Sequence, residues 1–216
     1  MGIKNEGNKK EWKLLRKKSK ADNLETFTYQ AETLSQLLSV LCEQSQETEE
    51  HSKRLKINCL AISEKLRLSE KEKNELVLLA LFHDIGKMAI DPAILNKPGK
   101  LNAKEWQEMQ KHPVIGYRIA KQNPKLAKIA DLILSHHEKW DGSGYPQGLS
   151  GENIPLASRI IAIVDAYDAM TNDRIYRKAL SKEEAITEIQ RNKGTQFDPL
   201  IADVFIKILQ KKKTET

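Results

Sequence analysis

The longest apolar run of the sequence, Leu76 to Phe82, leads directly into His83 and Asp84. A second apolar run, Ile160 to Val164, leads into Asp165 in the same way. An ionised carboxylate at the end of a buried apolar helix is costly unless positive charge compensates it. The chain must therefore fold so that these acids meet cations, and a group of bound metal ions would supply that charge.

The five histidines of the chain agree with this interpretation. They lie at the end or on one face of a predicted helix, and all but His112 are next to an acidic residue or another histidine; they are His51, His83, His112, His136 and His137. Glu47 precedes His51 by four residues, a spacing that places both on one helical face. Imidazole and carboxylate ligands without a nearby thiolate favour iron, manganese or zinc, and this many ligands predict two or more ions. The alternative is that they form separate ion pairs and helix caps.

The fold class is predicted to be all-α, with the metal centre in the core. Apolar residues recur at helical spacing, and no segment of useful length alternates with the period of a strand. Three pairs have the spacing of a capping box and so mark helix starts, namely Ser69 with Glu72, Asn102 with Glu105, and Ser181 with Glu184. Further helices are expected near residues 113–122 and 125–137, and after a loop that ends near Pro155.

The N-terminal region is predicted to differ from the rest. Residues 1–22 form a basic tail, because residues 1–20 hold eight basic and two acidic side chains and so account for the whole net charge of +6. A solvated leader is favoured over a binding arm. Residues 23–44 carry fewer than three apolar heptads, which favours packing against the domain over dimerisation or signal input. Residues 45–213 form the main domain.

Composition excludes some classes of protein. The longest apolar run is much shorter than the roughly 18 residues of a membrane span, and the start of the chain lacks the pattern of a secretion signal. The main domain has no net basic charge to bind a nucleic-acid polymer. We therefore expect a cytoplasmic protein, in which Cys42 and Cys59 are reduced core thiols.

Two or more metals beside cationic side chains are well suited to hydrolysis of a phosphoester, with a bridging hydroxide as the nucleophile. Lys87 lies three residues beyond Asp84, and Arg174 and Arg177 follow Asp165. They are candidates to hold phosphate groups, although surface salt bridges are the alternative for each.

Taken as a set, several motifs resemble the HD-GYP domain, a branch of the HD phosphohydrolase superfamily. The resemblance covers roughly residues 45–205. The motifs that carry it are His83-Asp84-Ile85-Gly86-Lys87, Lys97-Pro98-Gly99, Glu105-Trp106, His112-Pro113, His136-His137-Glu138, Asp141-Gly142-Ser143-Gly144-Tyr145-Pro146 and Gly194-Thr195-Gln196-Phe197-Asp198-Pro199.

The resemblance implies an HD-domain helical bundle with an HD-GYP extension, which hydrolyses cyclic di-GMP to pGpG and on to GMP. It implies two or three divalent ions, iron or manganese first, with zinc, nickel and magnesium as alternatives. The implied metal ligands are Glu47, His51, His83, Asp84, His112, His136, His137 and Asp165, with Asp84 as a bridge between two ions. The implied catalytic residues are His83, Asp84 and Lys87, and the implied substrate-binding residues are Lys87, Gly144, Tyr145, Arg174 and Arg177.

Some features depart from the family pattern, and none of them is a metal ligand. Ile90-Asp91-Pro92 replaces Ile-Pro-Asp, Arg174-Ile175-Tyr176 replaces Arg-Pro-Tyr, and the position of Arg177 is often Lys. Two other functions stay open: a non-catalytic cyclic dinucleotide receptor or interaction scaffold, and a hydrolase of another nucleotide. A second copy of the chain and a diguanylate cyclase or other signalling protein are candidate partners.

Overall fold

A computed structural model describes residues 34–41, 43, 48–173 and 178–211 of the chain. The chain divides into two units, residues 1–39 and 40–216. Residues 34–39 of the first unit are helical. The predictions made for residues 1–33, Cys42, Glu47, Arg174 and Arg177 lie outside the described residues.

The described part of the second unit is helical, and it holds no strand beyond one isolated bridge, so the all-α prediction is confirmed. Its α-helices and short 3-10 helices (η) are α2 (Glu49–Lys65), α3 (Glu70–Phe82), η1 (Ile85–Ala89), α4 (Pro92–Leu95), α5 (Ala103–Met109), α6 (His112–Gln122), η2 (Ala127–Ile129), α7 (Ala130–Leu134), η3 (Gly151–Asn153), α8 (Leu156–Thr171), α9 (Lys182–Arg191) and α10 (Pro199–Lys211). Within this described part, none of them is both long and apolar enough to cross a membrane.

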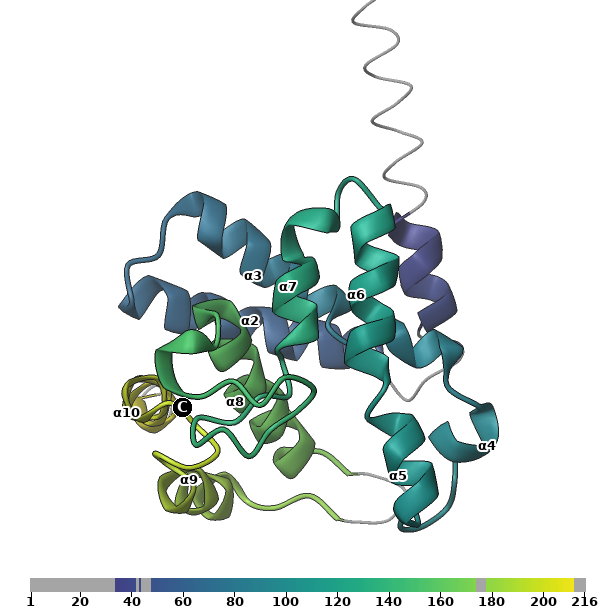
Figure 1. Cartoon of the computed structure of the whole chain (residues 1–216). Coiled ribbons are helices and arrows are strands. Elements are labelled where there is room, and N and C mark those ends of the chain that lie inside the picture. The colour runs from purple at the N-terminus through teal and green to yellow at the C-terminus, as the bar shows by residue number, and fades with distance from the viewer. Residues whose placement is uncertain (1–33, 42, 44–47, 174–177, 212–216) are drawn as a thin grey trace, which may run out of the picture. The chain divides into compact units, whose positions relative to one another are not determined.

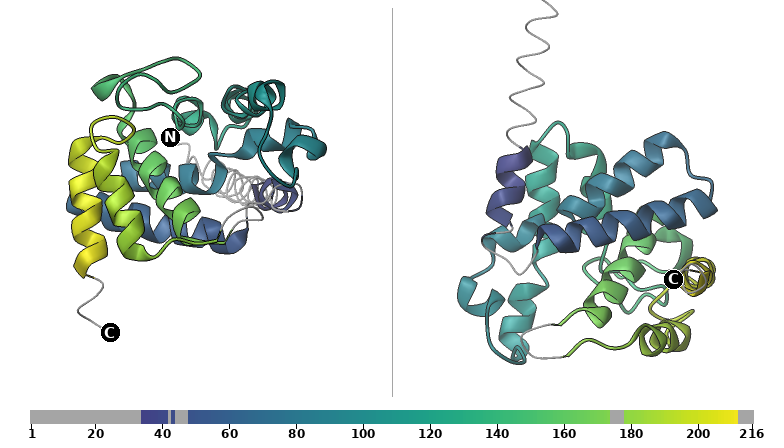
Figure 2. Two further views of the ribbon diagram at one scale, coloured as in Figure 1. Left: turned by 90° about the horizontal axis from the view of Figure 1, so that it is seen from below. Right: turned by 180° about the vertical axis from the view of Figure 1, so that it is seen from behind.

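The core of this unit lies among α2, α3 and α8, with the other helices packed around them. Helices α2 and α3 form an antiparallel hairpin, seen from behind in Figure 2, and α8 packs against both. Helices α6 and α7 run side by side, and α9 and α10 cover the other flank of α8 (Figure 1). Fully buried side chains from α2, α3 and α8, such as Leu55, Leu79 and Ile161, fill the space between them. Cys59 is among them and is a free thiol, as predicted.

The local start signals of the helices behave as predicted. Ser69, Asn102 and Ser181 each begin a helix with a complete capping box, in which the cap side chain and the glutamate three residues later bond each other's backbone N–H. Such caps satisfy backbone donors that a helix start would otherwise leave unpaired.

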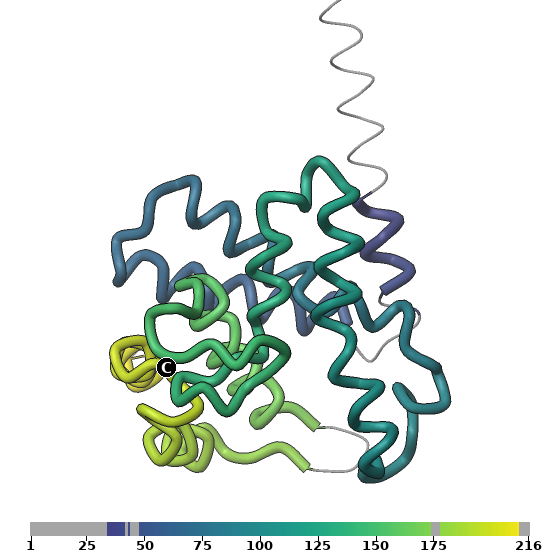
Figure 3. The backbone as a smooth tube through the Cα atoms, in the orientation of Figure 1, coloured from purple at the N-terminus to yellow at the C-terminus, as the bar shows by residue number. Residues whose placement is uncertain are grey.

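The helix predicted for residues 125–137 is shorter than expected and is split into η2 and α7. The reason lies in side chains that take over backbone acceptors at its end. Ser135 Oγ donates to the carbonyl of Asp131, and His136 Nδ1 donates to the carbonyl of Ile133. The chain then leaves the helix, so both histidines lie in a turn, followed by the irregular segment 138–150 that Figure 3 traces as a looping tube.

A backbone contact holds η1 against α6. A Cβ added at Gly86 would lie 1.9 Å from the carbonyl oxygen of His112 and 2.6 Å from the nitrogen of Gly116. No side chain fits in that space, so only glycine lets the two segments touch. Because Asp84 and His112 flank this contact, it sets the distance between two of the predicted ligands.

We predict that Gly86→Ala lowers the free energy of unfolding by about 2–4 kcal/mol, since the backbones of η1 and α6 must separate. Gly151→Ala is the matched control, because Gly151 has a φ of +57° with open space around it. That control should cost only about 1 kcal/mol of backbone strain. Denaturant unfolding of both variants in chelator measures the difference. Equal losses in the two variants would show that the close contact contributes nothing.

Candidate metal centre

Four of the predicted ligands converge at the junction of η1, α6 and the turn after α7. Asp84, His112, His136 and His137 each offer one ligand atom, and these atoms all lie within 4.8 Å of one another. His112 Nε2 is central, at 3.1 Å from Asp84 Oδ1, 3.3 Å from His136 Nε2 and 3.1 Å from His137 Nε2. We call this group the first cluster.

Hydrogen bonds to the backbone fix the tautomer of two of these rings. His112 Nδ1 lies 2.8 Å from the carbonyl oxygen of Met109, and His136 Nδ1 lies 2.6 Å from that of Ile133. A carbonyl oxygen can only accept, so each Nδ1 must carry the proton. In the neutral ring the lone pair is then on Nε2, which points into the cluster. Metal-binding histidines are commonly oriented by this kind of contact.

The donor set fits a metal ion. With both rings neutral, the Nε2 lone pairs of His112 and His136 face each other at 3.3 Å without a proton between them and repel each other. Asp84 Oδ1 is buried beside them and accepts no hydrogen bond from the described residues. A divalent cation bound between these atoms would remove both problems, because imidazole nitrogen and carboxylate oxygen are its usual protein ligands. The first cluster therefore has the chemistry of a divalent metal site.

The protonation states agree with this assignment. Burial lowers the pKa of His136, and burial together with the neighbouring imidazoles holds the pKa of His137 well below its usual value. Burial acts to raise the pKa of Asp84, but the charges of Lys87 and His83 outweigh it and hold that pKa well below its usual range. At neutral pH these shifts favour neutral rings for His136 and His137 and an anionic carboxylate for Asp84.

His51, His83 and Asp165 form a second cluster, again with ligand atoms within 4.8 Å of one another. His51 comes from α2, His83 caps the end of α3, and Asp165 comes from the middle of α8. Asp84 connects the two clusters, because its Oδ1 faces His112 while its Oδ2 lies 3.2 Å from His83 Nε2. The two groups are therefore adjacent, and one carboxylate faces both.

A carboxylate that the sequence analysis missed orients the second cluster. Asp168 Oδ2 accepts a hydrogen bond of 2.7 Å from His51 Nδ1, which turns His51 Nε2 toward Asp165. Arg54 and Asn172 also donate to Asp168. Burial acts to raise the pKa of Asp168, but the hydrogen bonds from Arg54 and His51 lower it overall. Its place three residues after Asp165, on the same helical face, was the signal available in the sequence.

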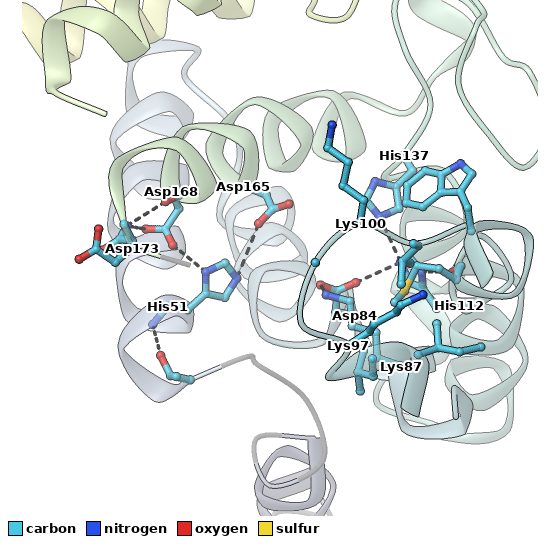
Figure 4. Close-up of a pocket in the computed structure, with 18 of the residues that line it drawn as sticks. His51, Asp84, Lys87, Lys97, Lys100, His112, His137, Asp165, Asp168 and Asp173 are labelled. Atoms are coloured by element: carbon cyan, nitrogen blue, oxygen red, sulfur yellow. Dashed lines mark hydrogen bonds and ion pairs between the residues drawn. The ribbon is translucent and has the colours of Figure 1, made fainter. Parts of the chain in front are cut away.

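Both clusters open into one cavity of about 890 Å³ (Figure 4). His51, Asp165, Asp168 and Asp173 lie on one side of it, and Asp84, His112, His137 and three lysines lie on the other. Those lysines are Lys87, whose Nζ is 2.6 Å from Asp84 Oδ2, and Lys97 and Lys100 from the segment before α5. A volume of this size is within the range of small-molecule sites.

The loop that follows His137 is fixed by a buried acid of its own. Glu138 accepts hydrogen bonds from the backbone N–H groups of Gln147 and Leu149. Gly144 packs so closely on Glu138 that an added Cβ would lie 2.5 Å from the Glu138 Cα. Tyr145 stacks on His137, with ring centroids 4.9 Å apart, and lines the cavity. Gly144 thus has a structural reason to be glycine, and its predicted contact with a nucleotide stays a prediction.

All seven of the predicted ligands that the structure describes lie in the two clusters. Glu47 is outside the described residues, since the description of α2 begins with its cap Thr48. Arg174 and Arg177 are outside them as well. The structure therefore brings together the residues that the sequence analysis singled out, from α2, α3, α6, α8 and the turn after α7.

The helical fold and the two clusters of imidazole and carboxylate groups define a domain of the HD type with a candidate metal centre. A family model described as an HD domain matches residues 21–201. The chain belongs to this HD-domain family, in its HD-GYP branch.

Known relatives agree with this assignment. A cyclic di-GMP phosphodiesterase of Thermotoga maritima is 37% identical over 190 residues, which cover 85% of this chain and 52% of the relative. A 3'3'-cGAMP-specific phosphodiesterase of Vibrio cholerae is 38% identical over 164 residues, or 75% of this chain and 31% of the relative. The chain thus spans between about a third and half of the length of these curated relatives.

The fold is also that of a solved structure. The chain superposes on a cyclic GMP-AMP specific phosphodiesterase of V. cholerae with a TM-score of 0.65 at 23% identity. The match covers 84% of this chain and 49% of that one.

We predict that Asp168→Asn weakens metal binding at the second cluster about 10- to 100-fold, because the amide neither orients His51 nor pairs with Arg54 as the carboxylate does. Metal content per chain and a chelator competition titration measure the effect. Asp131→Asn is the control, since Asp131 lies on the exposed side of α7. Unchanged affinity in Asp168→Asn with a normal thermal transition would contradict the orienting role.

We also predict that the metal-free protein loses stability as the pH falls from 7.5 to 5.5. The pKa values of His136 and His137 in the fold lie below the ordinary value of 6.5, so the unfolded chain takes up protons first. The contribution is fully present above pH 6.5 and declines below it. Denaturant unfolding in chelator at several pH values tests this, and His137→Gln should flatten the dependence. A stability that stays constant or rises on acidification would exclude the mechanism.

Proposed function

We propose that this chain is a metal-dependent phosphodiesterase that hydrolyses cyclic di-GMP to pGpG and GMP. The observation that supports this most is the presence of two adjacent imidazole–carboxylate clusters that open into one cavity with lysines on its wall. The cationic wall suits an anionic substrate, and the clusters suit metal-assisted attack on a phosphodiester. The similarity to cyclic di-GMP phosphodiesterases supports the choice of substrate.

We propose that each cluster holds one divalent ion, iron or manganese by preference, with Asp84 as the shared ligand. The basis is that its two oxygens face different clusters. Bound ions would supply positive charge that stabilises the phosphoryl oxygens and lower the pKa of an attacking water. A third ion would need Glu47 and therefore depends on a residue outside the described range.

The residues of the chain act around that centre in distinct ways. Asp84 stays anionic, and the lowered pKa values of His136 and His137 favour neutral rings at pH 7, so these three groups can bind metal without losing protons. Lys87 keeps an ammonium group at the base of the cavity, within reach of a phosphoryl oxygen. Tyr145 restricts the ring of His137 by stacking on it. Arg174 and Arg177 are proposed as further phosphate contacts on sequence grounds alone.

One observation favours a second substrate. Relatives named as 3'3'-cGAMP-specific match this chain with identities similar to those of the relatives named for cyclic di-GMP. Overall identity therefore does not separate a guanine–guanine from a guanine–adenine dinucleotide. A receptor without turnover is less favoured, since it would not require seven buried or half-buried ligand groups to converge. A cytoplasmic location, a homodimer and a signalling partner stay predictions.

We predict that the purified chain with Mn²⁺ or Fe²⁺ releases pGpG or GMP from cyclic di-GMP. His83→Ala and Asp84→Ala should reduce turnover at least about 1,000-fold, because each removes a ligand close to both clusters. Product chromatography with cyclic di-GMP and with 3'3'-cGAMP measures activity and preference. Leu200→Ala, an exposed change on α10, is the control for handling. Tight binding of either dinucleotide without turnover under any metal would favour the receptor instead.

A further inference from the structure

Trp106 is a large apolar side chain that is left open beside the cavity. Three large hydrophobic residues are strongly exposed among those that the structure describes, and they are Ile57, Trp106 and Leu200. Of these, Trp106 is the one that lines the cavity, and 46% of its surface is exposed. An exposed aromatic ring at a cavity suggests a binding role, because burial in the core would otherwise be favoured.

The indole extends a series of rings that begins at the first cluster. His137 stacks on Tyr145 at 4.9 Å with an interplanar angle of 27°. Tyr145 then meets Trp106 at 6.2 Å and 81°, an edge-to-face contact. Such a contact can cover at most one face of the indole. The other face of the Trp106 indole therefore remains available in the cavity, and the ring of Tyr145 connects this indole to the predicted metal ligand His137.

Cationic side chains accompany this aromatic surface. Lys97 and Lys100 line the cavity from the segment just before α5. Figure 4 shows both on the same side as Asp84 and His137, away from the acids of α8. Sites for nucleic-acid strands combine these two elements, since bases stack on aromatic rings while the backbone phosphates meet positive charge.

Ionic and capping contacts between α5 and the segment before it fix the position of Trp106. Lys97 Nζ donates hydrogen bonds to both carboxylate oxygens of Glu105, at 2.8 Å to Oε1 and 2.7 Å to Oε2. Glu105 also bonds the backbone N–H of Asn102, while Asn102 Oδ1 caps the helix by accepting from Glu105 N–H. This network ties α5 to the segment before it. The indole is thus presented from a fixed element, which lowers the entropy lost on binding.

We propose that Trp106 is a substrate-binding residue whose indole face stacks on one purine of the cyclic dinucleotide while the scissile phosphate lies at the metal clusters. This rests on the proposed function, and it adds a base-binding subsite at the rim of the cavity. Stacking needs only the π face of a base, so this subsite would accept guanine or adenine.

The test compares Trp106→Ala and Trp106→Phe with the wild-type full chain. Loss of one stacking partner weakens binding of a base about 5- to 150-fold. Trp106→Ala should therefore raise KM for cyclic di-GMP by that factor, with kcat and metal content changed less than about threefold. Trp106→Phe should recover most of the loss, which a purely structural defect would not predict. Methyl p-nitrophenyl phosphate, a diester without a purine, should be hydrolysed equally by all three proteins.

A binding measurement separates failure of this proposal from failure of the proposed function. Calorimetry with cyclic di-GMP and metal-free protein needs no turnover, and Trp106→Ala should bind about 5- to 150-fold more weakly than wild type. Leu200→Ala serves as a matched exposed apolar truncation outside the cavity and should bind as wild type does. Weaker binding in Trp106→Ala without wild-type turnover would keep the subsite and reject the enzyme.

Two results would overturn the subsite. One is unchanged KM and unchanged binding in Trp106→Ala while the wild type turns over cyclic di-GMP, which would leave the enzyme intact. The other is a wild type that binds no cyclic dinucleotide at all. An equal loss of activity toward methyl p-nitrophenyl phosphate would also count against stacking, because that substrate has no base.

Discussion

The buried carboxylate of Asp84 is the group on which the rest of the structure depends. Burial acts to raise its pKa, yet the pKa lies well below its usual range, with the charge of Lys87 as the main opposing cause. One oxygen faces the first cluster and the other faces His83 of the second. The helices that carry these partners must therefore meet at a single point, and α2, α3, α6 and α8 are arranged around it.

The site consists of parts with different degrees of constraint. At its base, the rings of His51, His112 and His136 are fixed by backbone carbonyls or by Asp168, and a glycine contact sets the spacing of η1 and α6. At its rim, Lys97, Lys100 and Trp106 are held through one short helix and its cap. The base suits reaction chemistry that demands accurate geometry, whereas the rim suits recognition of the less reactive part of a ligand.

Much of this could be predicted from the sequence, because its strongest signals are local. Helical periodicity and capping boxes give the helix starts, and acids beside apolar runs, such as Asp84 and Asp165, indicate compensating charge. Asp168 was missed because an acid on a helix face usually meets solvent. Its hydrogen bonds to His51 and Arg54 form only because α2 packs against α8 in the fold. The early end of α7 was missed for a related reason, since the ring of His136 replaces a backbone donor there.

The glycine contact between η1 and α6 also fixes the two points between which the segment with α4 and α5 is inserted. His112 is the first residue of α6. The segment that carries α4 and α5 therefore starts after η1 and ends at α6, two elements that touch each other at Gly86. Residues 91–110 therefore form an excursion whose anchor points stay together whatever lies between them. Exchanging residues 91–110 among relatives would replace the residues of the proposed base-binding subsite and leave all seven described ligand groups in place.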